Sequence, residues 1–387
     1  MELSSRVLAV KPSVTLEIAA KAKAMKAQGI DVISLSAGEP DFDTPAFIKD
    51  ACIESLKKGN TKYTPVPGTV ELRQAVCRKL KRDQGLDFTA EQIVVGCGAK
   101  HVIFNVLFAL LNPGDEVLIP VPYWLSYPEM VTVLGGTSVF LPSTEKTDFK
   151  ITPEMLAKAL TPRAKILILN SPSNPTGAVY SREELLALCA ALKKFPNVTV
   201  LSDEIYEKLV FDGRKHVSIA SLDPEIAKRT VIVNGHSKAY AMTGWRLGYA
   251  AFPEKTLAKA VESIQSHSTS NPVSFTQPGA VVALDQGDAE AQKMCAVFQK
   301  RRDLFIEKLK AVKSFKPFKP TGAFYLFVDI QGTGLSGFEV AKKLLDEVHV
   351  AVIPCEPFGS PHHIRMSYAT SEKDIETAVT RISSVFK

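Results

Sequence analysis

Polar side chains that can do chemistry follow three apolar runs of the chain, at the points where predicted strands end. Asn170 to Asn174 follow one run, Ser202-Asp203 follow the next, and Ser237-Lys238 follow a third. A lysine amine can bond to a carbonyl carbon and can transfer protons, whereas a buried carboxylate needs a cation or hydrogen-bond donors. Because ligands bind at the carboxyl ends of parallel strands, the sequence predicts one shared cleft that holds all three groups.

A fourth segment, Gly96-Cys97-Gly98-Ala99-Lys100, ends a predicted strand and begins a predicted helix. The backbone N–H groups of Ala99 and Lys100 can therefore face an anion at a helix N-terminus. The third glycine of a dinucleotide-binding GxGxxG motif is missing, which argues against a nicotinamide dehydrogenase.

The elements that position these groups alternate between residues 90 and 250. The predicted strands are Gln92–Val95, Glu116–Ile119, Ser138–Leu141, Lys165–Leu169, Val198–Leu201 and Thr230–Val233. The predicted helices between them are Ala99–Leu111, Pro153–Leu160 and Arg182–Lys194. Runs such as Ile166–Leu169 are apolar on both faces, which is typical of a covered parallel sheet. The pattern predicts an α/β fold with crossover helices.

The pattern changes after Phe252. The chain there predicts long helices, Lys255–His267 and Pro278–Ala311, and then strands at Phe324–Val328 and Ile364–Tyr368 with helices at Gly337–Leu345 and Glu372–Phe386. This indicates a second, smaller α+β domain. The predicted organisation is an N-terminal arm (1–12), a small domain (13–45 and 290–387) and a large domain (46–289).

The composition is that of a globular protein of ordinary polarity. The 387 residues are 45% hydrophobic and 23% charged, and the formal net charge of +6 comes with no nucleic-acid-binding motif. Six scattered cysteines lack CxxC spacing, so we expect neither a zinc site nor disulfides, and a reducing compartment. The apolar stretch from Val102 to Leu111 contains Asn105 and is too short to span a bilayer. We expect a cytoplasmic protein with no metal, membrane or nucleic-acid partner.

Three motifs in this order make the sequence similar to a known family. They are Asn174-Pro175-Thr176-Gly177, Ser202-Asp203-Glu204-Ile205-Tyr206 and the run from Ser237-Lys238 to Arg246-Leu247-Gly248-Tyr249. Together they resemble the class I pyridoxal-phosphate (PLP) aminotransferases, and most closely the bacterial-type aspartate aminotransferases of the aspartate/prephenate branch. The resemblance implies the PLP-dependent transferase fold of type I, with a mostly parallel sheet in a large PLP-binding domain.

The resemblance implies a role for each strand-end residue. Lys238 would hold the cofactor aldehyde as a Schiff base and carry the substrate proton. Asp203 would pair with the pyridine nitrogen, although an Asp there could instead cap a helix. Asn174 and Tyr206 would contact the cofactor O3′, and Asn174 could equally be a turn residue. Trp124 would stack on the pyridine ring, with ordinary core packing as its alternative.

The family also implies a phosphate site and a second subunit. Ser237 and Arg246 would bind the phosphate together with the amides of Ala99 and Lys100. Tyr63 would reach the phosphate of the neighbouring subunit, which implies a homodimer with shared active sites.

The implied substrate groups lie in the small domain and the arm. Arg365 would bind the α-carboxylate through two hydrogen bonds, with help from the Gly38 backbone, Asn174 and Trp124. Lys11 in the arm would meet a distal carboxylate, or would be a solvated residue of a mobile terminus. The predicted reaction is exchange between L-aspartate and 2-oxoglutarate. The alternatives are a broader range that includes prephenate or aromatic substrates, and a PLP β-lyase on the same fold.

Overall fold

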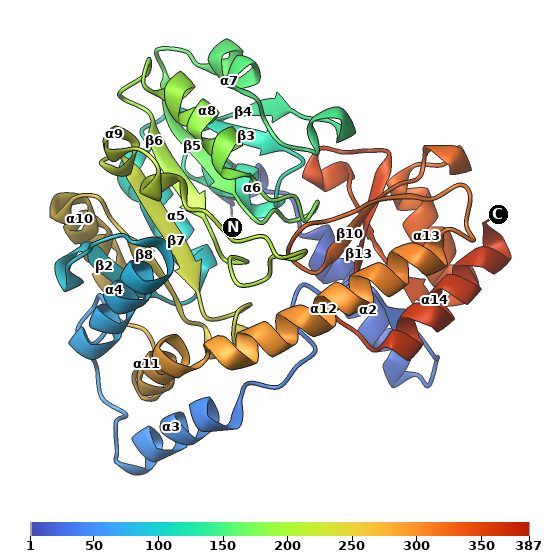
Figure 1. Ribbon diagram of the computed structural model, residues 1–387, viewed down its shortest axis with the longest axis horizontal. Helices are drawn as coiled ribbons and strands as arrows, with labels where there is room; N and C mark the ends of the chain where they lie inside the picture. The colour runs from blue at the N-terminus through green and yellow to red at the C-terminus, as the bar shows by residue number, and fades with distance from the viewer. Residues whose placement is uncertain (1, 387) are drawn as a thin grey trace.

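A computed structural model describes residues 2–386. Its largest sheet, shown in Figure 1, has seven strands. The strand order is β2-β8-β7-β6-β5-β3-β4. The strands are β2 (Ile93–Gly96), β3 (Glu116–Val121), β4 (Thr137–Pro142), β5 (Ala164–Asn170), β6 (Thr199–Asp203), β7 (Thr230–Gly235) and β8 (Gly248–Ala251). Strand β8 is antiparallel to β7 and β2, and the other neighbouring pairs are parallel. The sheet is therefore mostly parallel, as predicted.

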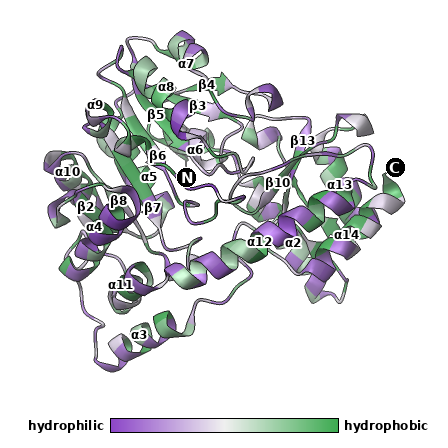
Figure 2. Ribbon diagram, viewed as in Figure 1, coloured by the Kyte–Doolittle hydropathy of each residue, from purple (hydrophilic) through white to green (hydrophobic). Residues whose placement is uncertain are grey.

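Helices cover both faces of this sheet, which explains why its strands look apolar throughout (Figure 2). Ile166 and Ile168 of β5 pack on the face covered by α5 (Ala99–Leu110), α6 (Ser126–Val133) and α10 (Lys255–Ser266). Leu167 and Leu169 point to the opposite face. That face is covered by α4 (Val70–Gln84), α7 (Pro153–Ala159), α8 (Arg182–Leu192) and α11 (Gln277–Gln286). Adjacent side chains of one strand thus enter two different cores.

The second unit is an antiparallel sheet of four strands in the order β12-β13-β10-β9. Its strands are β9 (Lys316–Phe318), β10 (Tyr325–Asp329), β12 (Ile353–Pro354) and β13 (His363–Ser367). It shares an apolar core with α12 (Asp288–Leu309), α13 (Gly337–Val348) and α14 (Glu372–Val385). The remaining α-helices are α1 (Ser5–Leu8), α2 (Val14–Ala27), α3 (Ala46–Lys57) and α9 (Pro224–Ala227). The remaining strands, β1 (Ile33–Ser34) and β11 (Val350–Ala351), pair with each other. This α+β unit agrees with the predicted smaller domain.

The single helix predicted for Pro278–Ala311 is wrong. The structure has two helices, α11 and α12, which meet at Gly287. A Cβ atom on Gly287 would lie 2.5 Å from the Ala283 carbonyl oxygen and 2.6 Å from the Tyr240 ring. The glycine lets the backbone turn tightly against Tyr240, and α12 can then run across to the smaller unit (Figure 1).

Polar contacts at Gly177 and Arg302 help to join the smaller unit to the larger sheet. The Gly177 carbonyl oxygen accepts hydrogen bonds from the N–H groups of Thr321 (3.0 Å) and Gly322 (2.9 Å), just before β10. Arg302 of α12 is fully buried and binds both carboxylate oxygens of Asp212, at 2.7 and 2.8 Å. The limits of the arm and the two domains stay a prediction, and their outer ends, residues 1 and 387, lie outside the described part of the chain.

Candidate active site

The ends of β5 and β6 lie side by side, as the cleft prediction requires. Asn170 pairs in register with Asp203, and its side-chain amide donates to the Asp203 carbonyl oxygen at 3.0 Å. Its side-chain oxygen accepts from the Asn174 N–H at 2.9 Å. Asn170 therefore fixes the loop that carries Asn174 against the strand that carries Asp203. The sequence interpretation gave Asn170 no role.

Asp203 is a buried carboxylate that neutral donors hold in place. Its Oδ2 accepts from the Tyr127 hydroxyl at 2.6 Å, and its Oδ1 accepts from the Ile205 N–H at 3.2 Å. Burial raises the pKa of Asp203 to about 6, although both donors act to lower it. The residues after it, 204–207, form no helix, so helix capping does not account for Asp203. A carboxylate in this setting suits a cationic ligand.

Lys238 lies half-buried at the end of β7, and its Nζ donates to the Gly38 carbonyl oxygen at 2.5 Å. The amine is 5.9 Å from the centroid of the Tyr206 ring. Burial lowers the pKa of Lys238 to about 8; Glu39 acts in the opposite sense, and Arg365 adds to the lowering. A substantial fraction of the amine is therefore neutral near pH 8, the form that can act as a base or nucleophile.

Arg365 of β13 is a buried cation with spare donors. It is 2% exposed, and its two terminal nitrogens donate to Asn174 Oδ1 (3.0 Å) and to the Ser36 carbonyl oxygen (3.1 Å). Its Nε has no hydrogen-bond partner, and no ion pair to Arg365 is present among residues 2–386. A guanidinium has five N–H groups, so this one keeps donors free for an anionic ligand, as a buried charge without a counter-ion requires.

Tyr325 of β10 connects two of the predicted residues. Its hydroxyl lies 2.8 Å from the Tyr206 hydroxyl, and its ring centroid is 4.3 Å from the Arg365 guanidinium carbon. The sequence interpretation missed both Tyr325 and Tyr127. Their signals were weak, since each is one aromatic residue within a run that is otherwise typical of a core element.

The helix N-terminus predicted to bind an anion is present at α5. Gly98 precedes it with a φ of 90°, and a Cβ atom there would lie 2.7 Å from Arg246 Nη2. A Cβ atom on Gly248 would lie 2.2 Å from the Ala99 nitrogen. The Arg246 Nη1 donates to the Thr243 carbonyl oxygen at 2.7 Å. Two glycines thus let an arginine and the first amides of a helix approach the same point.

Three further predicted residues have these surroundings. Ser237 is buried directly before Lys238. The Lys100 ammonium lies 4.8 Å from the centroid of the Trp124 ring, and burial followed by the nearby Arg246 lowers the pKa of Lys100. Trp124 packs edge-on against Tyr127, with ring centroids 5.3 Å apart. Trp124 therefore contacts both the Lys100 cation and Tyr127, whose hydroxyl binds Asp203.

Tyr63 and Lys11 do not join this group within the chain. Tyr63 is 88% exposed, so it is not packed against the other predicted residues of its own subunit. The Lys11 side chain is exposed, while its backbone N–H donates to Glu129 Oε2 at 2.9 Å. This bond ties the arm to α6, the helix that also carries Tyr127.

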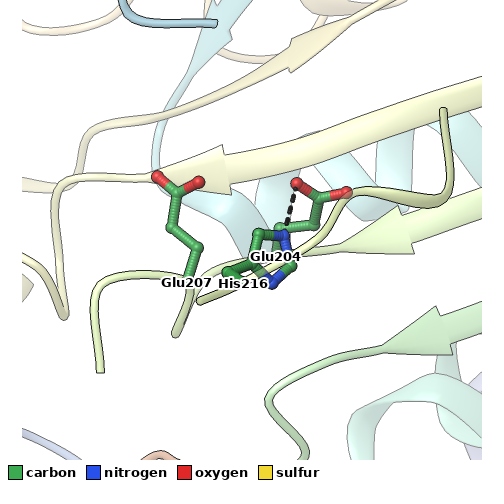
Figure 3. A group of neighbouring side chains, drawn as sticks. All are labelled: Glu204, Glu207 and His216. Carbon is green, nitrogen blue, oxygen red and sulfur yellow. Dashed lines mark hydrogen bonds and ion pairs between the residues drawn. The ribbon is translucent and has the colours of Figure 1, made fainter. Parts of the chain in front are cut away.

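Glu204, the residue after Asp203, belongs to an acidic cluster with Glu207 and His216 (Figure 3). Glu204, Glu207 and His216 have side-chain atoms within 4.8 Å of one another, a spacing that could hold a metal ion. Their charges are already compensated, because Gln84 Nε2 donates to both glutamates at 2.9 Å and Lys79 forms an ion pair with Glu207. Burial opposes ionisation of Glu204, yet His216 and three hydrogen bonds hold its pKa at about 2. We interpret the cluster as a structural ionic network.

Comparisons with known proteins agree with this geometry. The family model "Aminotransferase class I and II" matches residues 30–382. The chain is 48% identical to the aspartate aminotransferase of Geobacillus stearothermophilus, over 99% of this chain and 98% of that protein. It is 46% identical to the aspartate/prephenate aminotransferase of Cereibacter sphaeroides, with 99% and 98% covered. The solved structure of the Thermus thermophilus aspartate aminotransferase with maleate superposes with a TM-score of 0.95 at 42% identity, over 100% of both chains.

Proposed function

The chain belongs to the class I and II aminotransferases, and from this premise we propose that it is an aspartate aminotransferase that uses pyridoxal 5′-phosphate. The proposed reaction moves the amino group of L-aspartate to 2-oxoglutarate, in two half-reactions, and yields oxaloacetate and L-glutamate. The membership confirms the family predicted from the sequence. The observation that carries the proposal is Arg365, a buried cation with unused donors, in one site with the amine of Lys238 and the carboxylate of Asp203.

The residues present fit the cofactor. Asp203 is a buried carboxylate that forms no ion pair within residues 2–386, as the partner of a protonated pyridine nitrogen should be. Trp124 would cover the ring, and Asn174 and Tyr206 would contact O3′. The close approach of Gly98 to Arg246 leaves a glycine-lined cradle of the kind a phosphate needs.

The phosphate would be held by the Ala99 and Lys100 amides, Ser237 and Arg246. Tyr63 of the second subunit would complete the ligands. When bound, the cofactor supplies an electron sink for the electron pair left as the substrate Cα loses its proton.

The chain's own residues would handle the substrate. Lys238, whose pKa is lowered to about 8, would take the proton from the substrate Cα and deliver it to the cofactor carbon C4′. Arg365 would bind the α-carboxylate with the donors that Asn174 and Ser36 leave free, and the Gly38 backbone would lie against the same carboxylate. A carboxylate held in place by Arg365 would favour loss of the Cα proton over loss of the carboxylate.

The aspartate preference needs a second cation, and the chain offers two candidates. Lys100 is exposed and places its ammonium 4.8 Å from the centroid of the Trp124 ring, next to the proposed ring position. Lys11 lies in the arm, which Glu129 ties to α6. We propose that Lys100 meets the distal carboxylate of aspartate and that Lys11 assists with larger dicarboxylates such as prephenate. The name of the Cereibacter sphaeroides relative supports this broader range.

The proposed assembly is a homodimer with shared active sites, and the proposed compartment is the cytoplasm. An 88% exposed Tyr63 that the family uses across subunits supports the dimer. Six free cysteines are in keeping with a reducing compartment. In the described part of the chain, no helix combines the length and apolar character needed to cross a membrane. We further propose that residues 46–289 hold the cofactor and that residues 13–45 and 290–387 close over it.

One experiment tests both cofactor and reaction. The purified protein is saturated with PLP, reduced with borohydride and mapped by peptide mass; the pyridoxyl label should lie on Lys238. Unreduced protein and L-aspartate should give oxaloacetate stoichiometrically, and 2-oxoglutarate should then restore the starting absorbance. Release of ammonia in place of amino transfer would identify a β-lyase, and a label on another lysine would refute the assignment of Lys238.

A further inference from the structure

Tyr325 stands between two subsites that the proposed function uses separately. Its hydroxyl is 2.8 Å from that of Tyr206, and its ring lies against the Arg365 guanidinium at 4.3 Å. All three side chains are buried, with Tyr325 at 1% and Arg365 at 2% exposure. One side chain thus touches both the residue proposed to contact the cofactor O3′ and the residue proposed to bind the substrate carboxylate.

The direction of the Tyr206–Tyr325 hydrogen bond depends on the ligand. Without a ligand, either hydroxyl can donate. A phenol has one proton to donate, and Tyr206 would use its proton for the cofactor oxygen. The bond between the two tyrosines can then form only with Tyr325 as the donor. A donated hydrogen bond polarises the acceptor hydroxyl and strengthens the bond that it donates in turn.

The ring of Tyr325 gives the second connection. A guanidinium on an aromatic face is held by the ring and polarises it. Burial raises the pKa of Tyr325, while the Arg365 charge acts to lower it. A substrate carboxylate that neutralises Arg365 therefore weakens this effect on the Tyr325 hydroxyl, and through it on Tyr206.

We propose that Tyr325 is a positioning residue that couples the carboxylate subsite to the O3′ subsite: its ring orients Arg365, and its hydroxyl strengthens Tyr206 as a hydrogen-bond donor. The inference rests on the proposed function, because it needs PLP at Tyr206 and a carboxylate at Arg365. It assigns different tasks to two parts of one side chain, and two substitutions separate them.

The test uses the PLP-loaded protein and two readouts other than turnover. The first is the pH at which the absorbance of the bound chromophore changes, and the second is the Kd for maleate, the dicarboxylate of the Thermus thermophilus structure. Tyr325→Phe removes one neutral hydrogen bond, so the chromophore transition should move to higher pH by about 0.4–1 unit. The Kd for maleate should stay within about twofold in this variant, because the aromatic ring beside Arg365 remains. Tyr325→Leu should also raise the Kd about fivefold to thirtyfold.

Two controls make the role of Tyr325 specific. In the Tyr206→Phe background, Tyr325→Phe should give no additional shift, since its hydroxyl acts through Tyr206. Tyr368→Phe removes another buried hydroxyl, one that bonds to the Ala323 carbonyl oxygen, and should leave both readouts unchanged.

An unshifted transition in Tyr325→Phe would overturn the coupling through the hydroxyl. Equal maleate affinity in the Phe and Leu variants would overturn the role of the ring. Wild-type protein that binds no PLP, or whose Lys238 takes no label, would instead refute the proposed function, so the two failures are distinguishable.

Discussion

Asp203 is a residue whose buried carboxyl lowers the stability of the cofactor-free fold while providing the proposed partner of the pyridine nitrogen. The pKa of its carboxyl is about 6, above the ordinary value of 3.8, because burial disfavours the charge. In the folded, cofactor-free protein the proton is therefore held more tightly than in the unfolded chain, so stability falls as pH rises from about 3.8 to 6 and is level above that range. A bound pyridinium would reverse this cost.

Replacing Asp203 by Asn should therefore stabilise the cofactor-free protein and disable the loaded one. The amide keeps an acceptor for Tyr127 and removes the buried charge. We expect the free energy of unfolding to rise by roughly 3 kcal/mol at pH 8 and by about half of that at pH 5. Transamination should fall about 10²–10³-fold. Denaturant titrations at the two pH values and single-turnover assays measure both effects.

A surface residue provides the matched control for this prediction. Asp43 is exposed, and Asp43→Asn should change neither stability nor turnover appreciably. A cofactor-free Asp203→Asn protein no more stable than wild type at pH 8 would show that the carboxylate finds compensation that the structure does not contain.

Substrate range is also decided at single residues. Lys100→Gln keeps the backbone amide of Lys100 and removes its ammonium, so KM for aspartate should rise about tenfold to a hundredfold while alanine is affected little. Lys11→Gln should affect prephenate more than aspartate, because the arm offers a flexible point charge. Steady-state kinetics with aspartate and alanine as amino donors and with prephenate as the amino acceptor separate the two lysines. Equal losses for acidic and neutral donors would assign both lysines to folding or closure of the site.

At the scale of elements, the proposed phosphate site depends on the glycines before α5 and in β8, which let Arg246 and the helix N-terminus approach each other. Gly98→Ala adds a methyl group 2.7 Å from Arg246 Nη2 at a φ of 90°. We expect the Kd for PLP to rise at least tenfold, because Arg246 must move away from the helix N-terminus. Absorbance titration of the cofactor-free variant with PLP measures this.

Backbone strain alone should not give that result. Gly85, with a φ of 71° after α4, has open space where a Cβ atom would stand. Gly85→Ala should cost about 1–2 kcal/mol of stability for the left-handed backbone and leave PLP affinity unchanged. Equal PLP affinities for Gly98→Ala and wild type would contradict the proposal that Gly98 lets Arg246 and the N-terminus of α5 bind the phosphate together.

The sequence predicted elements well where a local pattern decided them. The apolar runs that form β5, β6 and β7 can be recognised as strands from the local sequence alone, and the motif residues lie at or just after the ends of these strands. The break at Gly287 was missed, although a glycine followed by Asp288 and Glu290 is a sequence signal for one helix ending and another beginning. The close packing of the Tyr240 ring against Gly287 exists only in the folded chain. Tyr127 and Tyr325 were not predicted because their roles depend on contacts that only the folded chain makes. Tyr127 is hydrogen-bonded to Asp203, and Tyr325 is hydrogen-bonded to Tyr206.

At the scale of the whole molecule, the site should need two subunits. Subunits with Tyr63→Ala and subunits with Lys238→Ala should each be nearly inactive as homodimers. In a mixed dimer, one of the two sites has both lesions and the other has neither, so mixing should restore activity to about a quarter of wild type when subunits exchange at random. Activity assays after co-refolding at varied ratios measure this. A mixture no more active than its components would place Tyr63 outside the site.

The ionic network behind Asp203 limits how this protein can change over generations. Lys79 and Gln84 of α4, Glu204 and Glu207 after β6, and His216 bind one another through ion pairs and hydrogen bonds, and Lys79, Glu204 and Glu207 are buried. Removing one member of the buried Lys79–Glu207 ion pair leaves the other charge uncompensated, which typically costs about 3–5 kcal/mol, a large share of the stability of most proteins. These five positions should therefore vary together or not at all, and a mutant library that randomises them one at a time will recover almost nothing but the starting residue.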